Sequence, residues 1–216
     1  MAEAGAQERG ELSFPVGLHM GLPQGPFAGN VNLAGGFNVG VVFPMASELG
    51  FRAELGSMIY GRKTRRVSLG TGALGLINFD VTTTNAIWFG NIGMQVGLPG
   101  PRLKPYLGGM IGFSDFSTNT SVTESNSADE PLALLQHSVD VALSQTVLGG
   151  LYIPLRSEIW LVDLGVRYTW NGKEVEYLTQ GDITEDAGGN IVLTPRRTRA
   201  DLLTAVIGMT LRRPKK

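Results

Sequence analysis

The residue types that most often perform catalysis or bind transition metals are scarce, because the chain has two histidines and no cysteine. His19 and His137 are far apart in sequence, and neither belongs to an HxH or HxxxH spacing that would place two imidazoles on one metal ion. Ser138 follows His137 directly, but adjacent residues rarely face each other as nucleophile and base, so a solvated loop is favoured there. Residues 70–75 are Gly-rich but lack the lysine and helix of a phosphate loop. We predict no metal site, no cofactor and no enzymatic activity.

Two groups of charged residues are better candidates. The first contains two guanidinium groups and two carboxylates, a set that can form ion pairs with one another. Its members are Arg52, Glu54, Asp163 and Arg167. The second is a basic cluster in which closely spaced cations could bind phosphate, although a solvated charged hairpin is an equally open interpretation. Its members are Arg62, Lys63, Arg65 and Arg66.

The elements that carry these residues are predicted as eight β-strands. In residues 158–170 the apolar side chains share one face and the polar ones the other, because successive residues of a strand point to opposite sides. The apolar face is Trp160, Val162, Leu164, Val166, Tyr168 and Trp170, and the other face is Asp163, Gly165, Arg167 and Thr169. The same alternation occurs in residues 32–43, 51–60, 85–98 and 201–211, and more loosely in residues 12–21, 103–114 and 141–153. Each segment is about the 9 to 11 residues that a tilted strand needs to cross a membrane.

The connectors alternate between long and short. Prolines mark the short ones at residues 44–48, 99–102 and 154–157, where the chain should reverse. The long ones are residues 23–31, 61–80, 115–140 and 171–199, and in an antiparallel arrangement they all fall on one rim. Within them, residues 127–135 resemble a capping box that opens a short helix, and residues 174–178 and 191–194 predict a projecting hairpin.

Composition excludes other classes. The formal net charge of -1 argues against a nucleic-acid partner, and no run of 18 or more apolar residues provides a membrane helix. A chain of 216 residues can form one barrel domain. We expect a flexible leader at residues 1–11, the barrel at residues 12–212 and a basic tail at residues 213–216.

Two motifs carry a family resemblance. The sequence KPYLGGMIGFS at residues 104–114 resembles a strand of OmpA-type and opacity-type outer-membrane barrels, and DLGVRY at residues 163–168 resembles their penultimate strand. The resemblance implies an all-β fold: an eight-stranded antiparallel up-and-down transmembrane β-barrel with short periplasmic turns and long extracellular loops. It also implies the bacterial outer membrane, with a signal peptide already removed. The chain departs from the family by ending in Arg-Arg-Pro-Lys-Lys rather than on an aromatic residue.

In a barrel of this size the interior is only wide enough for side chains. Arg52, Glu54, Asp163 and Arg167 should therefore point inward and pair, and Lys104, Tyr106 and His19 could join them. Phe43, Phe51, Trp160, Tyr168 and Trp170 should form aromatic bands at the membrane interfaces. The basic cluster Arg62, Lys63, Arg65 and Arg66 should lie near lipopolysaccharide phosphates.

We expect a monomer with a structural or surface-interaction role, whose partners are outer-membrane lipids and lipopolysaccharide, and which binds any unknown extracellular ligand through its long loops. One alternative is a soluble lipocalin-like barrel, in which Trp160, Val162, Leu164 and Val166 would face a cavity holding a small apolar ligand. Another is an outer-membrane lipid-modifying enzyme that depends on His19 or His137.

Overall fold

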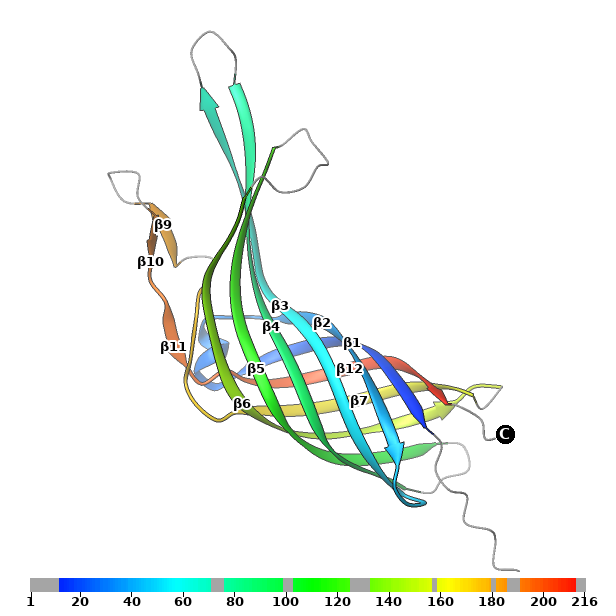
Figure 1. The fold of residues 1–216 in the computed structure, drawn as a ribbon. Helices are drawn as coiled ribbons and strands as arrows, with labels where there is room; N and C mark the ends of the chain where they lie inside the picture. The colour runs from blue at the N-terminus through cyan, green and yellow to red at the C-terminus, as the bar shows by residue number, and fades with distance from the viewer. Residues whose placement is uncertain are drawn as a thin grey trace, which may run out of the picture.

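Eight antiparallel strands close into a barrel in the order β1-β2-β3-β4-β5-β6-β7-β12, with β12 paired to β1 (Figure 1). The computed structural model describes residues 12–70, 76–98, 103–124, 133–156, 159–179, 182–185 and 191–212. The barrel strands are β1 (Ser13–Gln24), β2 (Ala34–Pro44), β3 (Leu49–Gly70), β4 (Leu76–Gly97), β5 (Lys104–Glu124), β6 (Ala133–Pro154), β7 (Trp160–Asn171) and β12 (Asp201–Arg212). The sequence prediction of an eight-stranded up-and-down barrel is confirmed.

The strand that alternates only loosely in hydrophobicity, β1, alternates strictly in burial. Its exposed side chains are Phe14, Val16, Leu18, Met20 and Leu22. The buried positions between them include Pro15, Gly17 and Gly21. Small and cyclic residues on the inner face blur a hydrophobicity pattern without changing the direction of the side chains. Strand β1 therefore has an exposed apolar face and a buried inner face, although its sequence alternates only loosely in hydrophobicity.

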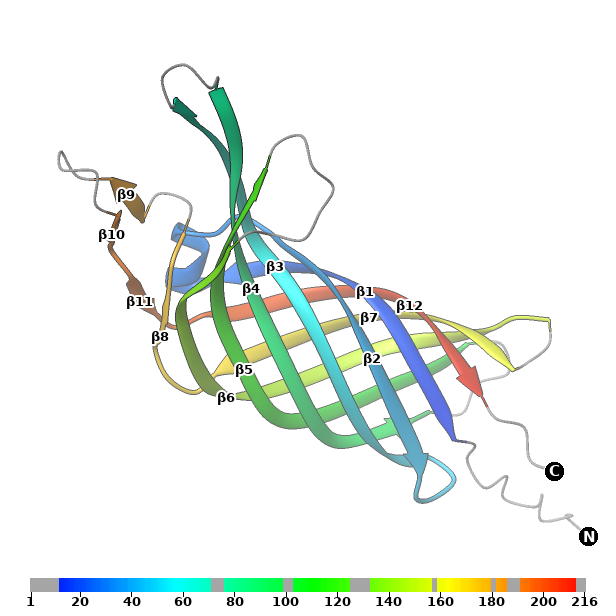
Figure 2. The same ribbon diagram turned by 45° about the horizontal axis from the view of Figure 1, so that its top comes forward.

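Four neighbouring strands continue far beyond the others as a four-stranded wall (Figure 2). Strands β3, β4 and β6 have 22 residues and β5 has 21, whereas β1, β2, β7 and β12 have only 11 or 12. The prediction that residues 61–80 and 115–140 are loops is therefore wrong for most of their length. These segments are rich in threonine, whose β-branched side chain favours strands, and cross-strand hydroxyl pairs join them. Thr64 and Thr82 lie 3.0 Å apart, and Thr83 and Thr120 lie 2.9 Å apart.

The predicted helix in residues 127–135 is also wrong where the structure describes it. Ala133 to Leu135 belong to β6 and pair with Val122 to Thr120 of β5, while residues 127–132 lie outside the described residues. A neighbouring strand offers ladder hydrogen bonds along the whole of β6, and this outweighs a local capping signal. His137 and Ser138 likewise lie in β6 rather than in a loop, and the side chains of both are outside the described set.

The last long connector contains the predicted hairpin, with a different pairing. Strand β8 (Val175–Tyr177) pairs with β11 (Arg196–Thr198), and β9 (Ile183–Glu185) pairs with β10 (Ile191–Leu193). The partner of β8 therefore begins two residues beyond the end of residues 191–194, the segment that the sequence suggested. The first connector forms a short 3-10 helix, η1 (Gly25–Gly29), which starts at Gly25 with φ 57°.

The short connectors lie at the opposite rim, where β1 begins and β12 ends (Figure 2). The turn after β2 is closed by hydrogen bonds from the Met45 and Ala46 N–H groups to the Leu49 carbonyl, and Phe43 and Phe51 face each other beside it. Residues 99–102 and 157–158 of the other two turns are outside the described residues. In the described part of the chain, no helix is long and apolar enough to span a membrane.

Candidate functional site: the filled lumen and the barrel wall

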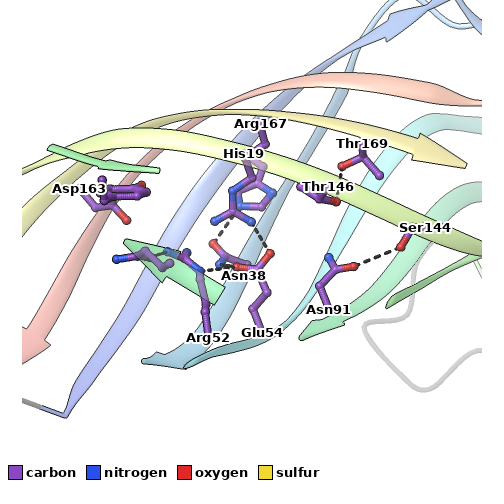
Figure 3. A network of polar contacts seen from close by, with 12 residues as sticks. His19, Asn38, Arg52, Glu54, Asn91, Ser144, Thr146, Asp163, Arg167 and Thr169 are labelled. Carbon is purple, nitrogen blue, oxygen red and sulfur yellow. Dashed lines mark hydrogen bonds and ion pairs between the residues drawn. The ribbon is translucent and has the colours of Figure 1, made fainter. Parts of the chain in front are cut away.

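A charged network crosses the middle of the lumen (Figure 3). Glu54 on β3 accepts a hydrogen bond from Arg52 Nε at 3.2 Å and one from Arg167 Nη1 at 2.5 Å. Strands β3 and β7 lie four positions apart in either direction around the ring, so the Glu54–Arg167 ion pair spans the diameter. Ion pairs of buried groups are stable only when further hydrogen bonds satisfy both partners.

Amide and hydroxyl groups supply those further bonds. Asn38 Nδ2 donates to Glu54 at 3.3 Å, and Asn38 Oδ1 accepts from His19 Nε2 at 2.8 Å. Arg52 is fully buried, and its Nη1 donates to Gln95 at 2.8 Å and contacts the Tyr152 hydroxyl at 3.4 Å. The network therefore joins side chains of β1, β2, β3, β4, β6 and β7.

Asp163, the fourth charged residue of the predicted group, lies outside the ion pairs. It accepts a hydrogen bond from the Tyr106 hydroxyl at 2.7 Å. A Cβ atom at Gly150 or Gly165 would lie 2.5 Å or 2.8 Å from that hydroxyl, so glycine at both positions leaves room for the tyrosine. The charges of two carboxylates and two guanidinium groups balance in this layer of the lumen. Lys104 begins β5 and is half-buried.

Aromatic rings fill the lumen on the side of the short turns. Tyr106 and Tyr152 are stacked with ring centroids 4.4 Å apart, and the Arg52 guanidinium lies 6.0 Å from the centroid of Tyr106. Met110, Leu148 and Leu161 complete a buried apolar cluster with these two rings. Tight packing of this kind leaves little interior volume at this level.

A second apolar cluster lies at the other mouth of the barrel, below the wall. Phe27 of η1 is completely buried and makes edge-to-face contacts with Tyr60, Phe116 and Tyr177, at centroid distances of 5.7, 6.2 and 5.0 Å. Edge-to-face geometry is favoured for such pairs. The rings come from η1, β3, β5 and β8, so two connector segments fold over the mouth. We call these four rings, with the buried Met58 and Ile87 that pack with them, the mouth cluster.

Polar contacts fasten these connectors to each other. Arg196 donates to both carboxylate oxygens of Asp182 at 2.9 Å and to Asn30 Oδ1 at 2.5 Å, and Asn30 in turn donates to the Tyr177 hydroxyl at 2.9 Å. The Thr179 N–H and hydroxyl also donate to Asp182. Burial alone would raise the pKa of Asp182, but the hydrogen bonds from Arg196 and Thr179 outweigh it and lower that pKa.

Between the charged network and the mouth cluster lies a cavity of about 30 Å³. His19, Glu54, Phe89 and Arg167 are among its lining residues, and the His19 and Phe89 rings are stacked 5.7 Å apart. This volume has room for roughly two water molecules. Among the described residues, no group of three or more acidic or histidine side chains is placed to hold a metal ion.

The outer face of the barrel is an apolar belt. Every barrel strand contributes exposed large apolar side chains, such as Leu18, Val39, Leu107 and Ile207. Leu164 and Val166, 39% and 54% exposed, lie on this outer face. The soluble lipocalin-like alternative placed them against an interior cavity, so it is wrong.

The predicted interface aromatics lie at both ends of the belt. Trp160 begins β7 and Phe43 and Phe51 flank the first short turn, all near one rim. Tyr168 and Trp170 lie at the other end of β7, with ring centroids 4.6 Å apart.

The basic cluster lies on the extension of β3, the edge strand of the wall. Arg62, Lys63, Arg65 and Arg66 are all exposed, and Arg66 Nε binds Asp80 of β4 at 3.1 Å. A register shift between Ile59 and Gly61 changes which face each side chain takes. Arg62 and Arg66 therefore lie on the outer face of the wall, and Lys63 and Arg65 lie on the other face.

The mouth cluster and the amide partners were not singled out from sequence. A signal for the mouth cluster exists, because Met58, Tyr60, Ile87 and Phe116 are large apolar residues at inward positions of predominantly polar faces. Such an interruption at the loop end of several strands indicates an apolar layer inside the barrel. Phe27, from a connector, has no comparable periodic signal.

A closed barrel with an apolar exterior and a charged interior belongs to the class of membrane-spanning β-barrels. The fold is similar to Ail, the attachment invasion locus protein of Yersinia pestis, with 13% identity, coverage of 95% of this chain and 99% of that one, and a TM-score of 0.48. Neisserial surface protein A is 14% identical, with coverage of 94% of this chain and 97% of that one and a TM-score of 0.48. The outer membrane protein OprG of Pseudomonas aeruginosa is 13% identical, with coverage of 95% of this chain and 97% of that one and a TM-score of 0.47. No protein-family model and no curated protein matches the sequence. The barrel architecture itself follows from the strand pairing.

Proposed function

We propose that this protein is a bacterial outer-membrane barrel with a lumen closed to solutes, and that it meets its partners at the cell surface through the wall formed by β3 to β6. The observation that carries the proposal is the direction of the side chains. Leu18, Leu164 and Ile207 point out, while Arg52 and Glu54 are buried inside. Lipid is the environment in which an exposed apolar belt of this kind is stable.

Three successive layers support a closed lumen. The Tyr106–Tyr152 stack lies near the short turns, the ion pair of Glu54 and Arg167 crosses the middle, and the mouth cluster covers the far end. Passage of a solute would require breaking buried ion pairs, which is costly because it leaves charges without partners. A structural or surface-interaction role therefore fits this lumen better than conduction.

The wall supports a role at the outer surface. By analogy with known barrels, the rim of long connectors is extracellular, so the wall would project from the cell. Its exposed cations Arg62, Lys63, Arg65 and Arg66 could form charge-assisted hydrogen bonds with lipopolysaccharide phosphates. Closure of the ring within one chain is consistent with a monomer.

Fractionation combined with a heat-modifiability gel tests the location. We expect the protein to partition into the detergent-soluble membrane fraction and to migrate differently before and after boiling. Conductance across a planar bilayer tests the closed lumen, where we expect none for the wild type and measurable current for a Phe27→Ala, Tyr106→Ala, Arg167→Ala triple variant, which removes a side chain from each of the three layers. Full solubility without detergent would reject the membrane assignment, and stable wild-type conductance would reject the closed lumen.

A further inference from the structure

The outer face of the barrel, below the wall, carries a groove at membrane depth. The groove has a volume of about 560 Å³ and is lined mainly by outward-facing apolar residues of β2 to β5, together with Glu54 and Asn91. The apolar residues include Val39, Ala53, Leu55, Ile92 and Phe113. The register places Val39, Leu55 and Phe113 in one cross-strand row through Gly90, and places Ala53 and Ile92 in the next row. A volume of this size is typical of small-molecule binding sites, and an apolar lining suits an acyl chain.

Directly above the groove lie two polar atoms for which the described residues supply no hydrogen-bond partner. Asp115 and Ser117 follow Phe113 at alternate positions of β5, so they lie on the same outer face. Asp115 Oδ1 and Ser117 Oγ are buried and make no hydrogen bond within the described residues, and Ser117 is only 4% exposed. Buried polar atoms are rarely left unsatisfied, so these two need a partner from outside the chain, and a ligand with hydrogen-bonding groups can supply it.

Trp88 lies where the outer face changes from apolar residues to polar residues. It lies opposite both Ser57 and Asp115 and is 52% exposed. Tryptophan is enriched where hydrocarbon meets the polar headgroups. The groove therefore lies on the hydrocarbon side of this level, and Asp115 and Ser117 lie at the headgroup side.

Further from the membrane, the same face continues as a polar ladder with cations. Arg62 is in one row with Thr84 and Asn119, and Arg66 is in a later row with Asp80 and Thr123. From Asp115 to Asn119, in the row of Arg62, is four residues, or roughly 13 Å of strand, and the ladder continues to Thr123. A polar face that extends this far offers more contacts than a simple phosphate-and-amine headgroup can make, and it matches a sugar headgroup that carries phosphate.

We propose that the outer face of β2 to β5 binds one phosphorylated glycolipid. Its acyl chain occupies the groove over Ala53, its sugar hydroxyl or amide groups hydrogen-bond to Asp115 and Ser117, and its phosphate lies against Arg62. The inference rests on the proposed membrane location and names the lipid that this surface selects. The competing occupant, a zwitterionic phospholipid, would use Asp115 and Arg62 but leave the polar ladder above them without a ligand.

The test uses the full chain, refolded in detergent, and measures retained lipid by native mass spectrometry with diphosphorylated lipid A and phosphatidylethanolamine as the two probes. We expect selective retention of lipid A. Ala53→Leu fills the groove, Asp115→Asn weakens the acceptor and Arg62→Gln removes the cation. Each should lower lipid A binding, by roughly tenfold for the two charge changes, since hydrogen bonds to charged groups are the strong ones.

Matched controls lie elsewhere on the barrel. Ala205→Leu adds the same bulk to the outer face of β12, and Glu176→Gln and Arg197→Gln remove exposed charges in the last connector. These three should bind lipid A as the wild type does. Equal retention of both lipids, preference for phosphatidylethanolamine, or site variants that behave as the controls do would each overturn the inference. Heat-modifiable migration of the same samples keeps this outcome separate from failure of the membrane assignment, because a barrel that folds without selecting lipid A contradicts the site alone.

Discussion

The two halves of the barrel differ in height. Strands β1, β2, β7 and β12 end where their outward apolar residues end, whereas β3 to β6 continue for about as many residues again. The short half indicates the length that a bilayer requires. The tall half shows that a sheet can leave the membrane when cross-strand pairs such as Thr64–Thr82 replace apolar burial.

Inside, the two halves depend on each other. Glu54 belongs to the tall half and Arg167 to the short half, and their ion pair joins opposite sides of the ring. The two halves therefore differ in the length of their strands, but the ion pair in the lumen connects them. The following predictions separate these two properties, beginning with the largest expected effect.

Glu54→Gln should be the most destabilising single change. It preserves shape but leaves Arg52 and Arg167 buried without their shared carboxylate, which typically costs about 3 to 5 kcal/mol. The free energy of unfolding, measured by urea titration of the barrel in lipid vesicles, provides the value. Glu176→Gln, an exposed change of the same chemistry, should fall within about 0.5 kcal/mol of wild type. Similar values for the two variants would contradict a structural role for the network.

Leu164→Arg should destabilise the short half through its lipid-facing side. An arginine near the middle of the bilayer costs about 2 to 4 kcal/mol in such barrels. Asn119→Arg, on the outer face of the wall beyond the membrane, should have an effect of at most about 0.5 kcal/mol. The same unfolding titration compares them, and equal costs at the two positions would mean that the wall is not outside the bilayer.

Shortening the wall should leave the barrel intact. Thr64 and Thr82 face each other, so residues 65–81 can be replaced by Asn-Gly, a pair suited to a tight hairpin. We expect the variant to retain heat-modifiable migration, because the network and the mouth cluster lie below the cut. Loss of folding would show that the wall is needed for closure of the ring.

Acid should loosen the connector over the mouth before it affects the barrel. The folded pKa of Asp182 lies below its ordinary value, so its contribution is present above the unfolded pKa near 4 and disappears as pH falls through the folded pKa. The Thr179 N–H, which donates to Asp182 at 2.8 Å, reports this change through hydrogen exchange. Protection that survives acidification, or that persists in Asp182→Asn at neutral pH, would argue against this role of Asp182.

The sequence predicts the membrane part of the fold well because lipid imposes alternation on every strand that crosses it. Residues 158–170 illustrate this, since Trp160, Leu164 and Val166 are exposed and Asp163 and Arg167 are buried. The strands of the wall could not be predicted from the sequence, because both faces of the wall contact water. Its threonine-rich strands therefore need no alternation of apolar residues. The mouth cluster depends on Phe27, whose place is determined by contacts between connectors that are distant in sequence.

The direction of the apolar side chains is tested most directly by quenching of fluorescence from single labels in vesicles with brominated acyl chains. Labels at Leu18, Leu164 and Ile207 should be quenched by the brominated lipid, whereas labels at Thr146 and Thr204, on the inner face, should not. Quenching of the inner positions, with protection of the outer ones, would contradict a lipid-facing exterior and with it the proposed function.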